Sequence, residues 1–477
     1  MIERTSSVVI LGGGPGGYEA ALVAAQLGAS VTVVDRDGLG GSSVLTDCVP
    51  SKALISTASF MTRLDDTRAL GVHLEDPVSG HTSDPEVDDV AVADLPIINR
   101  RILDLASAQS ADIQARLESE GVRILRGVGR LVGPLEVEAT PADGGDPERL
   151  TADVVLVCTG ATPRVLPTAM PDGERILTWK QIWDLPEVPE RLIVVGSGVT
   201  GAELAHGYLA LGSDVTLISS REHVLPGEDQ DAAKVIEDVF QRRGMTVLSR
   251  SRASAVERRG DGVVVTLDDG RTVEGSHCIM AVGSVPQTDG LGLEEAGVAL
   301  ARSGHIEVDR VSRTTARGVY AAGDCTGALP LASVAAMQGR TAMWHALGDA
   351  VAPINLHGVS ATIFTDPEIA TVGVSQREIE DKNLDCATIT MPLGTNPRAK
   401  MDRVTDGFIK LFAASTSGVV VGGVIVAPKA SELIFPVALA VTNRLTVDQV
   451  AHTFTVYPSI TGTIAEAARR LHPSSEV

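Results

Sequence analysis

Short runs of branched apolar residues alternate with glycine turns and alanine-rich stretches through the first two thirds of the chain. Such runs are typical of buried parallel strands, and they occupy residues 8–11, 31–34, 154–157, 192–195 and 215–218. Helical spacing predicts a helix that Gly28 ends, a second from about 52 to 62, a third over 96–120 and a fourth that ends at Gly212. Residues 74–91 read as a polar surface loop, and the Asp-Asp-Gly-Arg at 268–271 predicts a hairpin. From about residue 351, alternating β-branched residues predict strands again. This order predicts an α/β fold followed by a C-terminal region rich in strands.

The first strand–helix–strand unit carries a glycine motif. Residues 12–17 read Gly-Gly-Gly-Pro-Gly-Gly, and the strand that follows the helix ends at Asp35. Gly12 allows the tight turn, Gly14 lets the backbone approach a pyrophosphate, and Gly17 permits close helix packing. The helix N-terminus offers N–H groups to phosphates, and Asp35 can accept a hydrogen bond from a ribose hydroxyl. The unit therefore predicts a dinucleotide site.

A second copy of the motif occupies residues 196–201, between another apolar run and another helix. In each copy the second strand leads to a residue 23 positions after the first glycine, which is Asp35 in the first copy and Ser219 in the second. An acid at this place binds the ribose of NAD and repels the 2′-phosphate of NADP. Ser219 and Ser220 carry no such charge, and Arg221 is either a phosphate partner or a solvated surface residue. We therefore expect both nicotinamide cofactors to be accepted.

Composition narrows the class of protein. The 477 residues, 44% of them hydrophobic, are enough for several domains, and the net charge of −21 argues against nucleic acid or an anionic membrane as a partner. Five scattered cysteines without a CxxC pair fit a reducing compartment. No signal core precedes the first strand, and no run reaches the roughly 18 apolar residues of a membrane span. We expect a cytoplasmic protein with no integral membrane segment and no metal site.

The segment 38–52 connects the first unit to a helix and reads Gly-Leu-Gly-Gly-Ser-Ser-Val-Leu-Thr-Asp-Cys-Val-Pro-Ser-Lys. It resembles the redox-disulfide segment of the flavoprotein disulfide reductases, the family of dihydrolipoamide dehydrogenase and glutathione reductase. Residues 319–324, 365–373 and 396–400 resemble further motifs of that family, so the resemblance covers nearly the whole chain. It implies an α/β fold with two Rossmann-like FAD- and NAD(P)-binding domains and a C-terminal α+β interface domain that forms a homodimer. The implied boundaries are 1–155 and 283–350 for the FAD-binding domain, 156–282 for the NAD(P)-binding domain and 351–477 for the interface domain.

Three residues depart from the family pattern. The family carries two cysteines five positions apart, and this chain keeps the second as Cys48 but has Ser43 in place of the first. A serine hydroxyl cannot form a disulfide. The family also places a C-terminal His-Pro near the flavin of the partner subunit, with a Glu five residues after the His. Here Tyr457 replaces the His and Gly462 replaces the Glu, so the sequence indicates that the substrate is no longer a disulfide.

The resemblance implies four catalytic residues. Lys52 would lie beside flavin N5 and form an ion pair with Glu203. A cation beside N5 favours electron density on the reduced flavin. Cys48 would lie against the C4a edge of the flavin, either as a lone reactive thiol or as a packing residue. Tyr457 would line the acceptor site with Pro458.

The glycine motifs and the resemblance together predict the cofactor-binding residues. By resemblance, Asp324 accepts a hydrogen bond from the ribityl chain, and Leu331 and Ala332 lie under the flavin ring. The full predicted set is Gly12, Gly14, Pro15, Gly16, Gly17, Asp35, Arg36, Gly41, Ser42, Lys52, Gly127, Val128, Thr159, Gly160, Gly196, Gly198, Val199, Gly201, Glu203, Ser219, Ser220, Arg221, Gly283, Gly323, Asp324, Leu331 and Ala332.

The retained and lost residues together resemble a branch of NAD(P)H:quinone oxidoreductases. Hydride would pass from NAD(P)H to FAD, and the electrons then to a quinone or another small acceptor. A soluble pyridine-nucleotide transhydrogenase is an alternative, but it keeps the first cysteine and loses the second. A single-cysteine NAD(P)H oxidase, peroxidase or coenzyme-A-disulfide reductase would use Cys48, but those relatives lack the Cys-Val-Pro-Ser-Lys context. A flavin-binding interaction subunit without turnover is the non-enzymatic alternative, against which the two intact nucleotide units argue.

Overall fold

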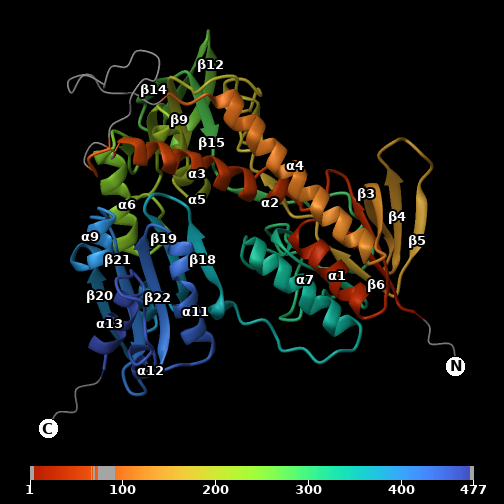
Figure 1. Cartoon of the computed structure of the whole chain (residues 1–477). Helices are drawn as coiled ribbons and strands as arrows, with labels where there is room; N and C mark the ends of the chain where they lie inside the picture. The colour runs from red at the N-terminus through yellow and green to blue at the C-terminus, as the bar shows by residue number, and fades with distance from the viewer. Residues whose placement is uncertain (1–4, 66, 68–69, 73–91, 473–477) are drawn as a thin grey trace. The chain divides into compact units, whose positions relative to one another are not determined.

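The chain forms two compact units, described by a computed structural model at residues 5–65, 67, 70–72 and 92–472 (Figure 1). The first unit comprises Met1–Ser51, Asn99–Arg164 and Gly283–Asn355, and the second comprises Lys52–Ile98, Val165–Val282 and Leu356–Val477. The polar loop expected at 74–91 lies outside the described residues. The four domain boundaries given above stay a prediction.

The first unit is built on a seven-stranded sheet of order β17-β6-β1-β2-β3-β4-β5, in which β17 to β3 run parallel and β3 to β5 antiparallel. Because β1 lies between β2 and β6, the loops after β1 and β6 flank the place where the strand order reverses, which is where such sheets bind ligands. A separate two-stranded sheet pairs β7 with β16. The strands are β1 Ser7–Leu11, β2 Ser30–Asp35, β3 Arg123–Gly133, β4 Glu136–Pro141, β5 Glu148–Thr151, β6 Val154–Val157, β7 Ala161–Pro163, β16 Ser284–Pro286 and β17 Val319–Ala321.

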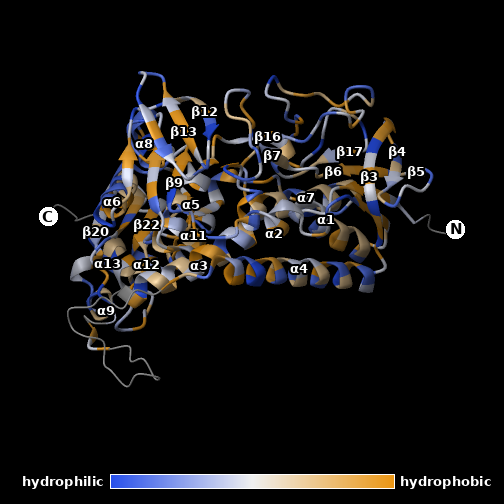
Figure 2. Cartoon of the chain, turned by 90° about the horizontal axis from the view of Figure 1, so that it is seen from above, coloured by the Kyte–Doolittle hydropathy of each residue, from blue (hydrophilic) through white to orange (hydrophobic). Residues whose placement is uncertain are grey.

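The α-helices of this unit within the described residues, some of them shared with the second unit, are α1 Pro15–Gln26, α2 Gly41–Leu45, α3 Cys48–Asp65, α4 Leu95–Ser119 and α7 Ala332–Ala346. The predicted helices before Gly28 and over 96–120 are confirmed. The helix expected from about Lys52 begins earlier, at Cys48. Pro50 is compatible with this start because it falls in the first turn, where a missing N–H removes no intrahelical hydrogen bond. Along α4, hydrophobic and hydrophilic positions alternate at helical spacing (Figure 2).

Strand β1 is buried on both faces. Val8 and Ile10 join one hydrophobic cluster with α1 and α7, whereas Val9 and Leu11 join another on the opposite face. Successive side chains of a strand point to opposite faces, so a strand covered on both faces has no polar positions. This explains the uninterrupted apolar runs from which the parallel sheet was predicted.

The nucleotide-binding part of the second unit repeats this plan. Its parallel sheet has the order β11-β10-β9-β15-β8, and a separate antiparallel sheet joins β12, β13 and β14. The hairpin predicted at residues 268–271 is confirmed between β13 and β14. The elements are β8 Ile176–Leu177, β9 Arg191–Val195, α5 Val199–Ala210, β10 Asp214–Ile218, α6 Gln230–Arg242, β11 Thr246–Leu248, β12 Ala253–Arg259, β13 Gly262–Leu267, β14 Thr272–Gly275 and β15 His277–Met280.

The C-terminal part of the second unit is an antiparallel sheet of order β18-β19-β22-β21-β20 with helices packed against it (Figure 1). Helices α11 and α13 share a hydrophobic core with β21 and β22, which confirms the α+β region. The elements are β18 Ser360–Ile363, β19 Glu368–Gly373, α8 Gln376–Asp381, β20 Cys386–Pro392, α9 Pro397–Met401, β21 Phe408–Ala414, β22 Val420–Ala427, α10 Ala430–Leu433, α11 Phe435–Thr442, α12 Val447–Ala451 and α13 Gly462–Arg470.

Candidate functional site

A glycine cradle follows β1 in the first unit. Gly12 has φ +101°, and a Cβ on it would lie 2.3 Å from the carbonyl oxygen of Cys158. A Cβ on Gly17 would lie 1.9 Å from the carbonyl oxygen of Gly12. Both positions therefore exclude any side chain. Gly14, at the start of α1, has open space beside it and no side-chain cap, so the N-terminus of α1 can receive a pyrophosphate.

The carboxylate of Asp35 orders the loops around this cradle. Its Oδ2 accepts from the Gly13 N–H at 2.7 Å and its Oδ1 accepts from the Gly38 N–H at 2.6 Å. The Gly40 N–H also donates to the Gly13 carbonyl oxygen at 2.8 Å. Each carboxylate oxygen of Asp35 keeps a second lone pair with which to accept from a ribose hydroxyl.

The segment 38–52, which resembles the redox-disulfide segment of the flavoprotein disulfide reductases, lies against the cradle. A Cβ on Gly41 would lie 2.9 Å from the Cα of Gly14, so only glycine allows this approach. The Ser43 hydroxyl donates to the Gly40 carbonyl oxygen at 2.8 Å and so closes its own turn. Cys48 begins α3 and is half-buried, and in the part of the chain that the structure describes none of the five cysteines forms a disulfide.

Asp324 lies in a turn directly after β17, and this turn is held by Gln338 from α7. The Gln338 side chain accepts from the Gly323 N–H at 2.8 Å and donates to the Thr326 hydroxyl at 3.2 Å. Burial raises the pKa of Asp324. Among the described residues, none donates a hydrogen bond to its carboxylate, which leaves both carboxylate oxygens able to accept a hydrogen bond from a ligand hydroxyl.

The turn after β6 is held in a similar way by Gln287, which follows β16. The Thr159 hydroxyl donates to the Gln287 carbonyl oxygen at 2.6 Å, and the Gln287 N–H donates to the Gly160 carbonyl oxygen at 2.9 Å. Its side-chain amide donates to the Thr159 carbonyl oxygen at 3.0 Å. Sequence reasoning missed both Gln287 and Gln338, because neither belongs to a glycine motif.

The other predicted residues of the first unit lie on several elements. A Cβ on Gly127 would lie 2.2 Å from the Thr140 carbonyl oxygen, so the pairing of β3 with β4 requires this glycine. Val128, the next residue, is exposed, and Arg36 pairs with Asp37 at 2.9 Å. The rest are Pro15 and Gly16 in the first turn of α1, Ser42 in α2, Gly283 before β16, Leu331 before α7 and Ala332 at its start.

A second cradle in the second unit has the same geometry. Gly196 has φ +109°, and its Cβ would lie 2.2 Å from the Ala281 carbonyl oxygen. A Cβ on Gly201 would lie 1.8 Å from the Gly196 carbonyl oxygen, whereas Gly198 has open space beside it. Val199 begins α5 and is exposed there. The second cradle thus provides the same backbone approach to a pyrophosphate as the first.

The residue at the end of β10 distinguishes the two cradles. Ser219 is fully buried, and its hydroxyl accepts from the Ser197 hydroxyl at 2.7 Å and from the Arg221 N–H at 3.2 Å. The Ser219 side chain therefore stabilises the loop after β10 through buried hydrogen bonds. Ser220 and Arg221 are exposed, and among the described residues no carboxylate forms an ion pair with Arg221.

The ion pair predicted between Lys52 and Glu203 is present in the second unit, at 2.8 Å. The Lys52 side chain is 29% exposed and that of Glu203 only 4%. The second carboxylate oxygen of Glu203 accepts from the Phe364 N–H at 2.9 Å, and the Lys52 ammonium lies 5.0 Å from the centre of the Phe364 ring. A buried carboxylate requires partners of this kind. Sequence reasoning missed Phe364, since a backbone donor leaves no residue-type signal.

Comparison with known proteins identifies the family to which this chain belongs. Residues 6–339 match the model of the pyridine nucleotide-disulphide oxidoreductases, and residues 359–468 match the dimerisation domain of the same family. The chain belongs to this family. Both the family and the fold expected from the sequence are thereby confirmed, and the cofactors of this oxidoreductase are FAD and NAD(P)H.

Three relatives show how far the similarity extends. The chain is 55% identical to an NAD(P)H dehydrogenase (quinone) of Mycobacterium tuberculosis over 97% of this chain and 93% of the relative. It is 30% identical to the dihydrolipoyl dehydrogenase of Geobacillus stearothermophilus over 97% and 95%. The crystal structure of LpdA from Mycobacterium tuberculosis has a TM-score of 0.92 at 54% identity, covering 98% of this chain and all of that one.

The C-terminal positions that replace the family's His and Glu lie in the second unit of this oxidoreductase. Tyr457 precedes Pro458 and its side chain is 83% exposed, while Gly462 begins α13. Large apolar side chains of the same region, among them Phe435, Phe454 and Val456, are also exposed. Within the described ranges, no helix has the length and apolar character of a membrane span, and no cluster of acidic, His and Cys side chains forms a metal site.

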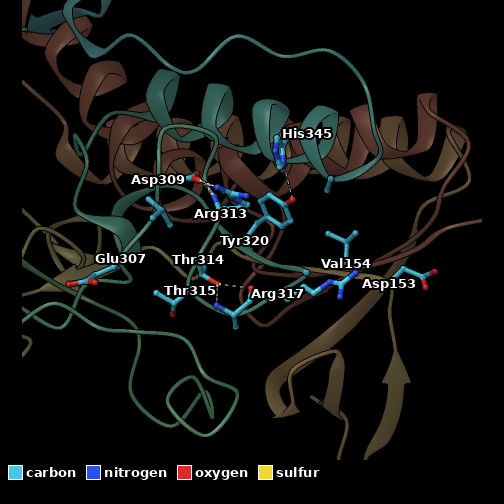
Figure 3. Close-up of a pocket in the computed structure, with 14 residues that line it drawn as sticks. Asp153, Val154, Glu307, Asp309, Arg313, Thr314, Thr315, Arg317, Tyr320 and His345 are labelled. Carbon is cyan, nitrogen blue, oxygen red and sulfur yellow. Dashed lines mark hydrogen bonds and ion pairs between the residues drawn. The ribbon is translucent and has the colours of Figure 1, made fainter.

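A hollow of about 750 Å³ lies elsewhere on the first unit (Figure 3). Val154 at the start of β6 and Gly318 just before β17 line it, so it lies at the N-terminal ends of these strands, whereas the first glycine cradle follows the C-terminal end of β1. Tyr320 and His345 point toward each other there, with 2.9 Å between the phenol oxygen and Nδ1. None of the predicted site residues lines this hollow.

Proposed function

We propose that this chain is an FAD-dependent NAD(P)H:quinone oxidoreductase without disulfide reductase activity. The observation that carries the proposal is a contrast within one molecule. Both nucleotide cradles and the Lys52–Glu203 pair are intact, whereas Ser43 and Tyr457 stand where sulfur chemistry needs a thiol and a base. The name of the Mycobacterium tuberculosis relative, at 55% identity, supports the same activity.

Each retained group has a role in this proposal. When bound between these residues, FAD would supply the redox chemistry, which is acceptance of hydride from NAD(P)H and delivery of electrons to a quinone. Lys52 acts beside the flavin as a fixed cation, and Glu203 holds its ammonium in place. Cys48 has no second cysteine with which to form a redox disulfide. Ser43, which stands in that place, donates its hydroxyl hydrogen bond within its own turn.

The acceptor and the assembly follow from the C-terminal region. A quinone needs no covalent thiol step and can stack on an aromatic surface, so Tyr457 is a suitable acceptor-site residue.

We propose a cytoplasmic homodimer. The match to the family's dimerisation domain and the exposed apolar side chains Phe435, Val456 and Tyr457 support the dimer. We keep the four-domain division as part of the proposal.

The first prediction concerns the electron acceptor. NAD(P)H oxidation is followed with a small quinone, lipoamide, oxidised glutathione and oxygen offered separately. We expect turnover with the quinone and none with either disulfide, because the chain lacks the residues that open a disulfide. Tyr457→Phe should raise the KM for quinone about threefold to tenfold, which corresponds to one lost hydrogen bond. Robust lipoamide turnover would contradict the proposed function, and unchanged quinone kinetics of Tyr457→Phe would remove only the role of Tyr457.

The second prediction concerns the choice between NADH and NADPH. Kcat/KM with the two cofactors should agree within about a hundredfold, because the second cradle has no acid at the ribose position. Arg221→Ala should lower kcat/KM for NADPH about tenfold and leave NADH nearly unchanged, since only NADPH carries the 2′-phosphate. Arg250→Ala is the matched control, because Arg250 already pairs with Glu222. Equal losses with both cofactors would show that Arg221 does not read the 2′-phosphate.

A further inference from the structure

Phe364, the first residue after β18, contacts both members of the Lys52–Glu203 pair. Its backbone N–H donates to Oε1 of Glu203 at 2.9 Å, while Lys52 donates to Oε2 at 2.8 Å. Its ring centre lies 5.0 Å from the Lys52 ammonium. The three residues come from α3, α5 and the turn between β18 and β19, all within the second unit.

These contacts constrain the carboxylate of Glu203 first. The side chain is 4% exposed, so each oxygen depends on a protein donor in place of water. One donor is a flexible lysine and the other is a backbone N–H. The backbone donor sets the orientation of the carboxylate, because a peptide group cannot rotate as a lysine side chain can.

The same contacts constrain the ammonium of Lys52. A lysine head on a four-carbon stem moves freely unless its surroundings hold it. Here Glu203 holds it through an ion pair, and the ring of Phe364 attracts it through the negative face of the aromatic system. Because the side chain is still 29% exposed, loss of the ring would let the ammonium turn toward water.

The turn that carries Phe364 is itself anchored. The Arg243 guanidinium, just after α6, pairs with the Asp366 carboxylate at 2.8 Å and donates to the Asp366 carbonyl oxygen at 3.1 Å. The Thr365 hydroxyl is buried and donates to the Pro367 carbonyl oxygen at 2.7 Å. The ring and the N–H of Phe364 therefore belong to a turn that an ion pair and two hydrogen bonds anchor.

We propose that Phe364 is a positioning residue for the redox site, which holds the Lys52 ammonium in one place and thereby sets the rate at which bound FAD is reduced. The inference rests on the proposed function, in which Lys52 acts beside the flavin. Phe364 lies in the segment that matches the dimerisation domain. That segment therefore contributes to the redox machinery of its own chain as well as to assembly.

Phe364→Leu tests the ring alone, because leucine keeps the backbone N–H that Glu203 needs. We expect the rate constant for reduction of bound FAD by NAD(P)H, measured by stopped flow without any quinone, to fall about tenfold. The FAD content and the thermal midpoint should stay close to those of the wild type. Phe364→Tyr, which keeps the ring face, should restore the rate to within about twofold.

Phe408→Leu is the matched control. Phe408 is buried in the core, and its ring centre lies 5.5 Å from the ammonium of Lys410, which belongs to a different ion cluster. This variant should lower the thermal midpoint and leave the rate of FAD reduction unchanged. The two leucine variants thus separate loss of a ring beside any lysine from loss of the ring beside Lys52.

A double-mutant cycle gives the decisive result. In a Lys52→Met background, Phe364→Leu should cause no further slowing, because the ammonium that the ring positions is absent. A Phe364→Leu enzyme as fast as the wild type, or an equal loss in both backgrounds, would overturn the inference. A wild-type protein whose FAD is reduced rapidly but which fails with quinones would overturn only the proposed acceptor. One whose FAD is never reduced by NAD(P)H would overturn both proposals.

Discussion

Replacing Gly201 with alanine should give a yellow, FAD-containing protein that NAD(P)H no longer reduces. The new Cβ would lie 1.8 Å from the carbonyl oxygen of Gly196, so α5 and the turn before it must separate. The pyrophosphate of NAD(P)H then loses its backbone partners. We expect the second-order rate constant for FAD reduction to fall at least a hundredfold, about 2.7 kcal/mol of transition-state stabilisation.

The first cradle predicts the complementary result. A Cβ on Gly17 would lie 1.9 Å from the carbonyl oxygen of Gly12, so Gly17→Ala should give a colourless protein. Gly227→Ala is the control for an added methyl group, because a Cβ there meets no atom within 4 Å. FAD content is read from the visible spectrum and secondary structure from circular dichroism. A Gly201→Ala protein that is reduced at the wild-type rate would contradict the assignment of the second cradle.

Removing the ammonium of Lys410 should destabilise the protein more than any surface substitution. Lys410 in β21 lies 2.8 Å from Asp229 and 2.6 Å from Asp231, and its side chain is only 4% exposed. Asp229 also caps α6 through the N–H groups of Asp231 and Ala232. Lys410→Met leaves a buried carboxylate without its cation, which costs about 3–5 kcal/mol of unfolding free energy.

Urea denaturation checks this value, and two further variants interpret it. Lys234→Ala in α6 removes an exposed ion pair with Asp238 and should cost less than about 1 kcal/mol. Adding Asp229→Asn to Lys410→Met should recover part of the loss, since asparagine still caps the helix but carries no buried charge. Equal losses for Lys410→Met and Lys234→Ala would show that burial of the cluster does not determine its contribution.

Periodicity and glycine chemistry were enough to predict most of the fold. Runs such as Val8–Leu11 are apolar at every position because both faces of the sheet are covered, and this property is visible in the chain itself. The helix expected from about Lys52 begins four residues earlier, at Cys48, and Pro50 lies in its first turn, where a proline is tolerated.

For the predicted site, the sequence identified residue types but not the direction in which each side chain points. Gly12, Gly17, Gly196 and Gly201 were predictable, because a position that excludes Cβ requires one residue type. Ser219 was placed correctly at the end of its strand, but its hydroxyl is buried against Ser197. Only the folded loop determines whether that hydroxyl points inward or toward the cofactor.

The sequence alone determined that this chain has two dinucleotide cradles and lacks the residues of the disulfide relay, because both statements concern which residue types are present. Only the tertiary structure decided what holds the retained charges in place. Lys52 meets Glu203 across 151 residues, and Glu203 meets the backbone of Phe364 across 161. A peptide N–H is present at nearly every residue, so its choice of partner is set by the packing of distant segments and leaves no pattern in the chain.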